Sequence, residues 1–84
     1  MQMRDTTTGT VINVVQHVIL RNFWEYYITE KGDQPFALVV GDFTEMGYID
    51  REEIRPYIMS VCNSGLSDIM SAPGWEWVSK ENLT

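Results

Sequence analysis

The 84-residue sequence is poor in the residues that most enzyme and metal sites require. It has one cysteine, Cys62, so no disulfide can form within the chain, which agrees with a reducing compartment. It has one histidine, His17, whereas a zinc site draws three or four ligands from Cys, His and carboxylate side chains. The G-x-S-x-G, H-E-x-x-H and phosphate-loop motifs are absent. We therefore expect a protein that is not an enzyme and has no cofactor.

Two combinations of reactive side chains do not change this expectation. His17 and Cys62 are a formal pair of base and nucleophile, but no nucleophile motif surrounds Cys62. Cys62 lies in the apolar run "YIMSVC", which is typical of a buried structural thiol. Carboxylates such as Glu52 and Glu53 are paired, but acid–base catalysis needs them in a cleft. A chain this short has little room for a cleft, so a solvated acidic face is expected.

Basic residues are scarce as well, with six Lys and Arg against twelve Asp and Glu and a formal charge of −6. This balance argues against direct nucleic-acid binding and against attraction to an anionic membrane, because both need basic side chains. No apolar run is long enough to span a membrane, and residues 1–10 contain no hydrophobic signal core. We expect a cytoplasmic protein whose charge serves solubility or a partner protein with a basic surface.

The apolar residues, 44% of the sequence, suffice for one domain, expected at 10–80 between a flexible lead at 1–9 and a tail at 81–84. Val, Ile and aromatic residues dominate from 11 to 30. They favour two strands broken near Arg21-Asn22, with a helix over 11–21 as the open alternative. The turn "KGDQP" then predicts a hairpin of 23–30 with 36–43. The continuous apolar run in 36–43 predicts a strand covered on both faces.

The following segment predicts a turn and then a helix. We expect Gly47 in a tight turn, after which Tyr48 and Ile49 return briefly to the core. Asp50 can cap the helix, with Glu52 and Glu53 in its first turn.

The helix is expected to run through "EIRPYIMSVCNSG", with apolar side chains at helical spacing. Pro56 should kink or restart it, and Gly65 should end it. "WEWV" at 75–78 predicts an edge strand. The expected fold is α+β, a small antiparallel sheet of three to five strands with one or two short helices after the central hairpin.

Residues 42–53, "DFTEMGYIDREE", resemble a calcium loop in spacing. The oxygen ligands would be Asp42, Thr44, Asp50 and Glu53. Met46, however, stands at a ligand position and has no oxygen, and the preceding segment is expected to be a strand, whereas an EF-hand needs a helix there. Calcium binding is therefore an alternative, and the preferred interpretation is an acidic turn that leads into a helix.

Aromatic residues are more numerous than a small core requires. Trp and Tyr are enriched at protein interfaces, where a large rigid side chain anchors a partner. Four acidic residues of the segment 42–53 form what we call the acidic rim: Asp42, Glu45, Glu52 and Glu53. The candidate partner-binding set is this acidic rim together with Trp75 and Trp77. A structural subunit that forms a homodimer through the edge strand near Trp75 is a further alternative.

Three stretches, "WEYYITE" (24–30), "FALVVGDF" (36–43) and "EMGYIDREEI" (45–54), resemble a family of small uncharacterised domains carried by bacterial plasmids and phages. The family pattern is an aromatic strand ending in Thr-Glu, a Phe-led apolar strand and a Glu-Leu-Gly-Tyr junction, where Met46 replaces the usual Leu. The resemblance implies an α+β fold and a mobile-element origin, and it implies no activity.

Together these observations predict a small acidic, non-enzymatic accessory protein that binds another protein. If the origin is a mobile element, the partner is expected to be a host defence or nucleic-acid-handling complex. Inhibition would then resemble that of anti-CRISPR proteins or nucleic-acid mimics, with acidic groups placed where nucleic acid would lie.

Overall fold

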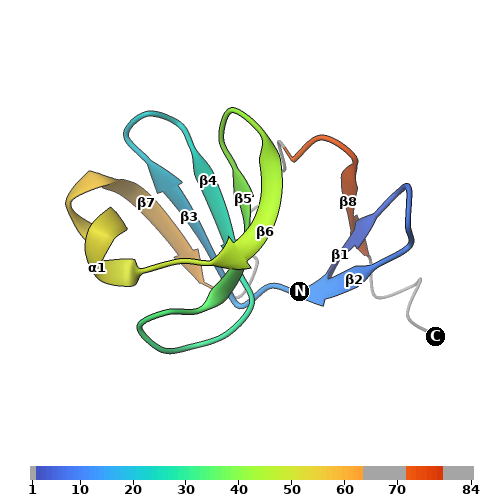
Figure 1. The fold of residues 1–84 in the computed structure, drawn as a ribbon, viewed down its shortest axis with the longest axis horizontal. Coiled ribbons are helices and arrows are strands. Elements are labelled where there is room, and N and C mark those ends of the chain that lie inside the picture. Colours follow the sequence, from blue (N-terminus) through green and yellow to red (C-terminus); the bar gives the residue numbers. More distant parts are fainter. Residues whose placement is uncertain (1, 64–71, 79–84) are drawn as a thin grey trace.

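The computed structural model describes residues 2–63 and 72–78, which form two antiparallel sheets (Figure 1). The smaller sheet has the order β2-β1-β8 and consists of β1 (Gln2–Asp5), β2 (Val11–Asn13) and β8 (Trp75–Val78). The larger sheet has the order β6-β5-β4-β3-β7 and consists of β3 (Gln16–Leu20), β4 (Glu25–Ile28), β5 (Phe36–Val40), β6 (Thr44–Tyr48) and β7 (Ile58–Asn63). Helix α1 (Arg51–Ile54) and the 3-10 turn η1 (Arg55–Tyr57) connect β6 to β7.

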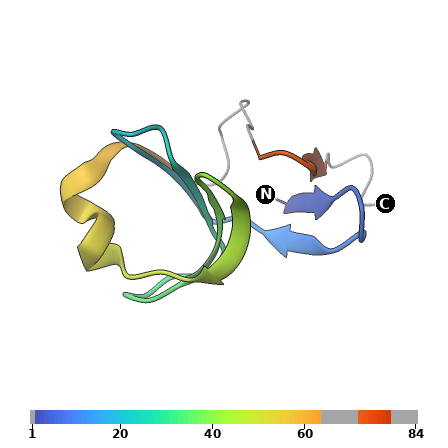
Figure 2. The ribbon, with the colours of Figure 1, turned by 45° about the horizontal axis from the view of Figure 1, so that its top comes forward.

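The larger sheet is strongly curled, and α1 and η1 lie across its open side (Figure 2). Strands β3 to β6 follow one another as hairpins, and β7 then returns to pair with β3. The concave face holds one hydrophobic core, to which α1 contributes Ile54. The other buried members are Val18, Leu20, Tyr26, Ile28 and Ala37.

The convex face of the same sheet packs on the smaller sheet and forms a second core. Met3 and Ile12 from the smaller sheet meet Tyr27 and Leu38 from the larger one. Strands β4 and β5 therefore have buried residues on both faces, which explains the continuous apolar run of β5.

The break near Arg21-Asn22 and the hairpin that follows it are confirmed, and the helical alternative over 11–21 is wrong. The first expected strand is in fact two strands, β2 and β3, which belong to different sheets. β3 and β4 are joined by a turn at residues 21–24, where the side chain of Asn22 accepts a hydrogen bond from the Trp24 N–H at 3.1 Å. The left-handed residue of this turn is Phe23, with φ of 69°, rather than Asn22. β8 is also confirmed, and it lies at an edge of the smaller sheet within the described residues.

The flexible lead expected at 1–9 is wrong for residues 2–5. They form β1, the central strand of the smaller sheet, and Met3 has no exposed surface. A segment of four residues with one inward-facing apolar side chain has no local sequence pattern that predicts a strand. Pairing with β2 and β8 is therefore what makes this segment a strand.

The long helix expected after Asp50 is also wrong. Only 51–54 are α-helical; Pro56 restarts the chain in η1, and 58–63 form a strand paired with β3. The β-branched Ile58 and Val61 fit a strand as well as they fit a helix face, and the open edge of β3 decides between the two. The expected helix end at Gly65 and the tail at 81–84 lie outside the described residues.

Two further expectations concern Gly47 and Tyr48. Gly47 lies within strand β6 and not in a turn, because its backbone pairs opposite Ala37. Tyr48 is 76% exposed and does not return to the core, whereas Ile49 is half-buried against the concave core. The single sheet expected from the sequence is in fact two sheets with short helical segments. No helix among the described residues has the length and apolar character needed to cross a membrane.

Candidate functional site

The structure does not bring the six predicted partner-binding residues together. Asp42 and Glu45 are exposed at the β5–β6 hairpin, whereas Glu52 and Glu53 are exposed on α1 beyond the far end of β6. The acidic rim is therefore divided into two by strand β6.

The two predicted tryptophans lie elsewhere in the fold. Trp75 and Trp77 belong to β8, on the smaller sheet, and are half-buried against the core between the sheets. The ring of Trp77 packs edge-on against Tyr27 at a centroid distance of 6.0 Å. Much of their apolar surface thus serves packing.

The four oxygen ligands of the calcium alternative are likewise separated. Asp42 precedes β6, Thr44 begins it and Asp50 follows it, so an extended strand lies where a calcium loop would fold around an ion. Nowhere in residues 2–63 and 72–78 do three His, Cys, Asp or Glu side chains gather closely enough to hold a metal ion. Residues 42–53 therefore do not have the geometry of a calcium loop.

Two adjoining cavities lie beside α1, and together they form what we call the Tyr26–Glu53 groove. The first cavity has a volume of about 490 Å³ and the second about 400 Å³. Both are lined by Tyr26, Glu53 and Ile54. The first is completed by Gln34, Tyr48, Ile49 and Asp50, and the second by Leu20, Arg21, Asn22, Trp24 and Tyr57.

Helix α1 is short, and local contacts fix where it begins. The Asp50 carboxylate accepts a hydrogen bond from the Glu52 N–H at 2.9 Å, as expected for the N-cap. Ile54 is buried in the concave core and therefore sets the rotation of the helix. With Ile54 turned inward, the preceding residue, Glu53, lines the groove.

Arg51 ties the helix to strand β3 and to the loop before β5. Its guanidinium donates to the side chain of Gln16 at 2.6 Å, to the carbonyl of Glu30 at 3.3 Å and to the carbonyl of Gly32. The N–H of Arg51 also donates to the carbonyl of Asp33 at 2.9 Å. These bonds join α1 to β3 and to the loop before β5, and they hold in place the helix that carries Glu53.

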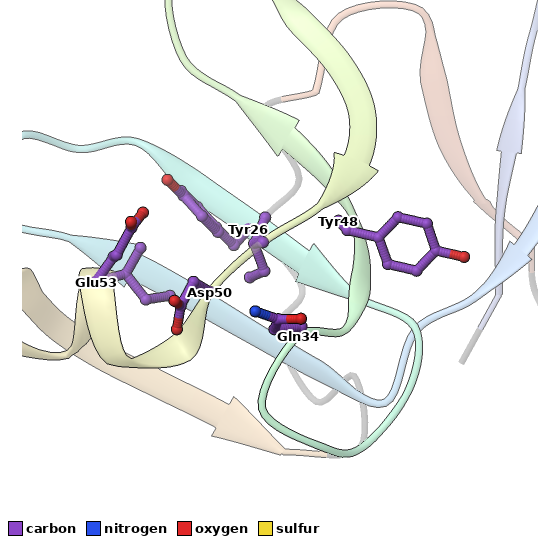
Figure 3. A pocket seen from close by; sticks show the side chains of 7 residues that line it. Tyr26, Gln34, Tyr48, Asp50 and Glu53 are labelled. Atoms are coloured by element: carbon purple, nitrogen blue, oxygen red, sulfur yellow. The ribbon is translucent and has the colours of Figure 1, made fainter.

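Aromatic side chains line the second cavity. The ring of Trp24 lies on the backbone of Gly41, and the N–H of Arg21 donates to the carbonyl of Tyr57 at 2.8 Å, which holds η1 beside the β3–β4 turn. Figure 3 shows that the Tyr48 ring points away from Glu53, and it packs edge-on against Phe36 at 5.1 Å. The aromatic surface of the second cavity is supplied by Trp24, Tyr26 and Tyr57.

The Tyr26 hydroxyl and the Glu53 carboxylate lie at the same end of the first cavity (Figure 3). Burial, and secondarily the negative charge of Glu53, raise the pKa of the Tyr26 phenol above its ordinary value. Ion pairs within the described chain join Arg4 to Glu76 and Arg55 to Glu52, and Glu25 lies 2.9 Å from His17 Nε2. Glu53 belongs to none of these pairs, so a bare carboxylate and a buried phenol face one space. This arrangement suits a cation supplied from outside the chain.

A second polar cluster, formed by His17, Glu25 and Tyr27, was not predicted from the sequence. Its members are separated along the chain and form no recognised motif. The Glu25 carboxylate lies 2.9 Å from His17 Nε2 and accepts a hydrogen bond from the Tyr27 hydroxyl, also at 2.9 Å. The His17 and Tyr27 rings stack at 4.2 Å, and Cys62 is opposite His17 in the β3–β7 register. All but Cys62 are buried, and the cluster satisfies its own polar atoms, as a structural core group does.

Comparisons with family models, with curated proteins and with solved structures find no match to this chain. The resemblance to mobile-element domains therefore stays a prediction. Function is inferred below from the chemistry of the Tyr26–Glu53 groove.

Proposed function

We propose that this protein is a non-enzymatic binding protein whose Tyr26–Glu53 groove takes a basic segment of another protein. The observation that carries this proposal is the Glu53 carboxylate, which has no cationic partner in the described chain and lies beside the buried phenol of Tyr26. A basic side chain from a partner would supply the missing positive charge.

The aromatic lining supports the same proposal on energetic grounds. An exposed ion pair contributes only about 0–1 kcal/mol, so Glu53 alone would bind a partner weakly. Trp24 and Tyr57 add apolar and π surface in the same groove, and Trp and Tyr are the side chains that dominate binding energy at interfaces. The charge of −6 would in addition speed the encounter with a basic partner.

The chemistry of the groove favours partners whose own surface is basic. Proteins that handle nucleic acid have such surfaces, because they neutralise phosphate with Lys and Arg. We therefore extend the proposal to inhibition of a nucleic-acid-handling or host defence complex, with acidic groups of this chain in the place of nucleic acid. The exposed Asp42 would add to the negative surface outside the groove.

A displayed library of random peptides, selected on the intact chain, tests the proposal. Selected peptides should be enriched in basic residues, and calorimetry should show that Glu53→Gln weakens their binding by about two- to five-fold. Glu45→Gln is the matched control, since it removes the same charge from an exposed site outside the groove. Peptides without basic residues, or peptides that bind the Glu53→Gln variant equally well, would contradict the proposed function.

A further inference from the structure

The second cavity of the groove has a composition suited to one particular side chain. Three aromatic residues and one carboxylate line it: Trp24, Tyr26, Tyr57 and Glu53. Aromatic faces attract cations, and a carboxylate offers two oxygen acceptors. We propose that this cavity is an arginine pocket, in which a guanidinium group of the partner pairs with Glu53 and stacks on the aromatic wall. This inference rests on the proposed function and specifies the ligand of the same groove.

The hydrogen-bond acceptors in the cavity match the N–H donors of a guanidinium group. Tyr26 is 9% exposed and its hydroxyl has no hydrogen-bond partner among the described residues, although it borders both cavities. Glu53 likewise has no cationic partner there. A planar group with five N–H donors in a fixed fork can bond to the carboxylate in a bidentate manner and still reach the phenol oxygen.

Lysine fits the same cavity less well. Its ammonium group is compact and strongly hydrated. When it enters the cavity it loses water, and three acceptors would have to take the place of that water. A guanidinium group is more weakly hydrated and stacks on aromatic rings, which suits a cavity walled by Trp24 and Tyr57. The cavity is therefore expected to bind arginine more tightly than lysine.

Arg21 of the chain itself also lines the second cavity and is exposed. It forms no ion pair with Glu53 in the described structure, so it acts as a like charge at the rim of the pocket. Removing that charge should raise the affinity for arginine by about two- to five-fold. This effect would not occur if the arginine bound at a site distant from Arg21.

The test uses N-acetyl-arginine amide and N-acetyl-lysine amide as probes, titrated into the intact chain and followed by NMR chemical shifts. We expect saturable shifts around Trp24 and Tyr57 and a preference for the arginine probe of about ten-fold. Glu53→Gln should remove the preference, Arg21→Gln should strengthen binding, and Glu45→Gln should change neither.

A lysine probe that binds as tightly as the arginine probe would overturn the arginine pocket. So would the absence of saturable shifts, or shifts that Glu53→Gln leaves unchanged. If longer basic peptides still bind the groove through Glu53, the proposed function stands and only the arginine pocket is excluded. The proposed function itself fails if the selected peptides lack basic residues or if their binding does not depend on Glu53.

Discussion

The indole ring of Trp24 lies directly on the backbone of Gly41, which is the first residue of the turn between β5 and β6. A Cβ atom built on Gly41 would fall 2.6 Å from atoms of the ring, which is closer than real Cβ contacts allow. The glycine is required here by space and not by backbone conformation, since its φ is not in the left-handed region. This contact holds Trp24 in place as a wall of the second cavity.

Substituting Gly41 by Ala should therefore destabilise the protein. Because the rigid ring must move, we expect a loss of about 1–3 kcal/mol in the free energy of unfolding, measured by chemical denaturation. Gly47→Ala is the control, since a Cβ there meets nothing within 4 Å. Equal stability of the two variants would show that Trp24 moves away from Gly41 without cost.

The raised pKa of Tyr26 predicts how stability depends on pH in the alkaline range. The folded state holds the phenol proton more tightly than the unfolded state, whose pKa is the ordinary 10.0. This contribution is fully present below pH 10.0 and is lost as the pH rises through the folded-state pKa.

A spectrophotometric titration of the wild-type chain against Tyr26→Phe should isolate the Tyr26 curve. Glu53→Gln should move its midpoint toward lower pH, because the negative charge raises the pKa. A midpoint unchanged by Glu53→Gln would mean that the carboxylate does not face the phenol.

The buried cluster around Glu25 predicts a graded response to substitution. Glu25→Ala leaves the polar atoms of His17 and Tyr27 without their acceptor, and should lower the free energy of unfolding by about 1–3 kcal/mol. Glu25→Gln keeps an oxygen that can accept both hydrogen bonds and should cost less. Denaturation curves that place the two variants in the opposite order would rule out a hydrogen-bonding role for the carboxylate.

The N-cap of α1 predicts a local effect that also reaches the groove. Asp50→Ala removes the acceptor of the Glu52 N–H and should lower the free energy of unfolding by about 0.5–2 kcal/mol, whereas Asp50→Asn should lower it less. Hydrogen exchange should show faster opening of residues 51–54 in the alanine variant. Unchanged exchange there would show that Arg51 and Ile54 hold the helix without the cap.

Part of the fold was predictable because its causes are local. β-branched and aromatic residues predicted β3 and β4, a continuous apolar run predicted β5, and alternation predicted β8. A side-chain oxygen before Glu52 predicted the cap at Asp50. Each of these signals acts within a few residues of its origin. The chain contains them whether or not the rest of the domain is folded.

Strands β1 and β7 were missed because nothing local distinguishes them. β1 is a polar segment with Met3 as its one buried apolar residue, and it is a strand because β2 and β8 flank it. Ile58 and Val61 in β7 have helical spacing but β-branched side chains that suit a strand, and β3 offers the free edge. Backbone hydrogen bonds to distant strands decided both segments.

The candidate site divides in the same way. The acidic segment 42–53 made Glu53 one of four acidic candidates for partner binding, and the aromatic content predicted an interface. Only the tertiary structure placed Tyr26 of β4 and Trp24 beside Glu53, while it assigned Trp75 and Trp77 to the core between the sheets. Charge and composition are properties of the chain, so the sequence determined them. Which side chains share a cavity depends on strand pairing and on the curl of the sheet, and these arise only when the whole domain folds.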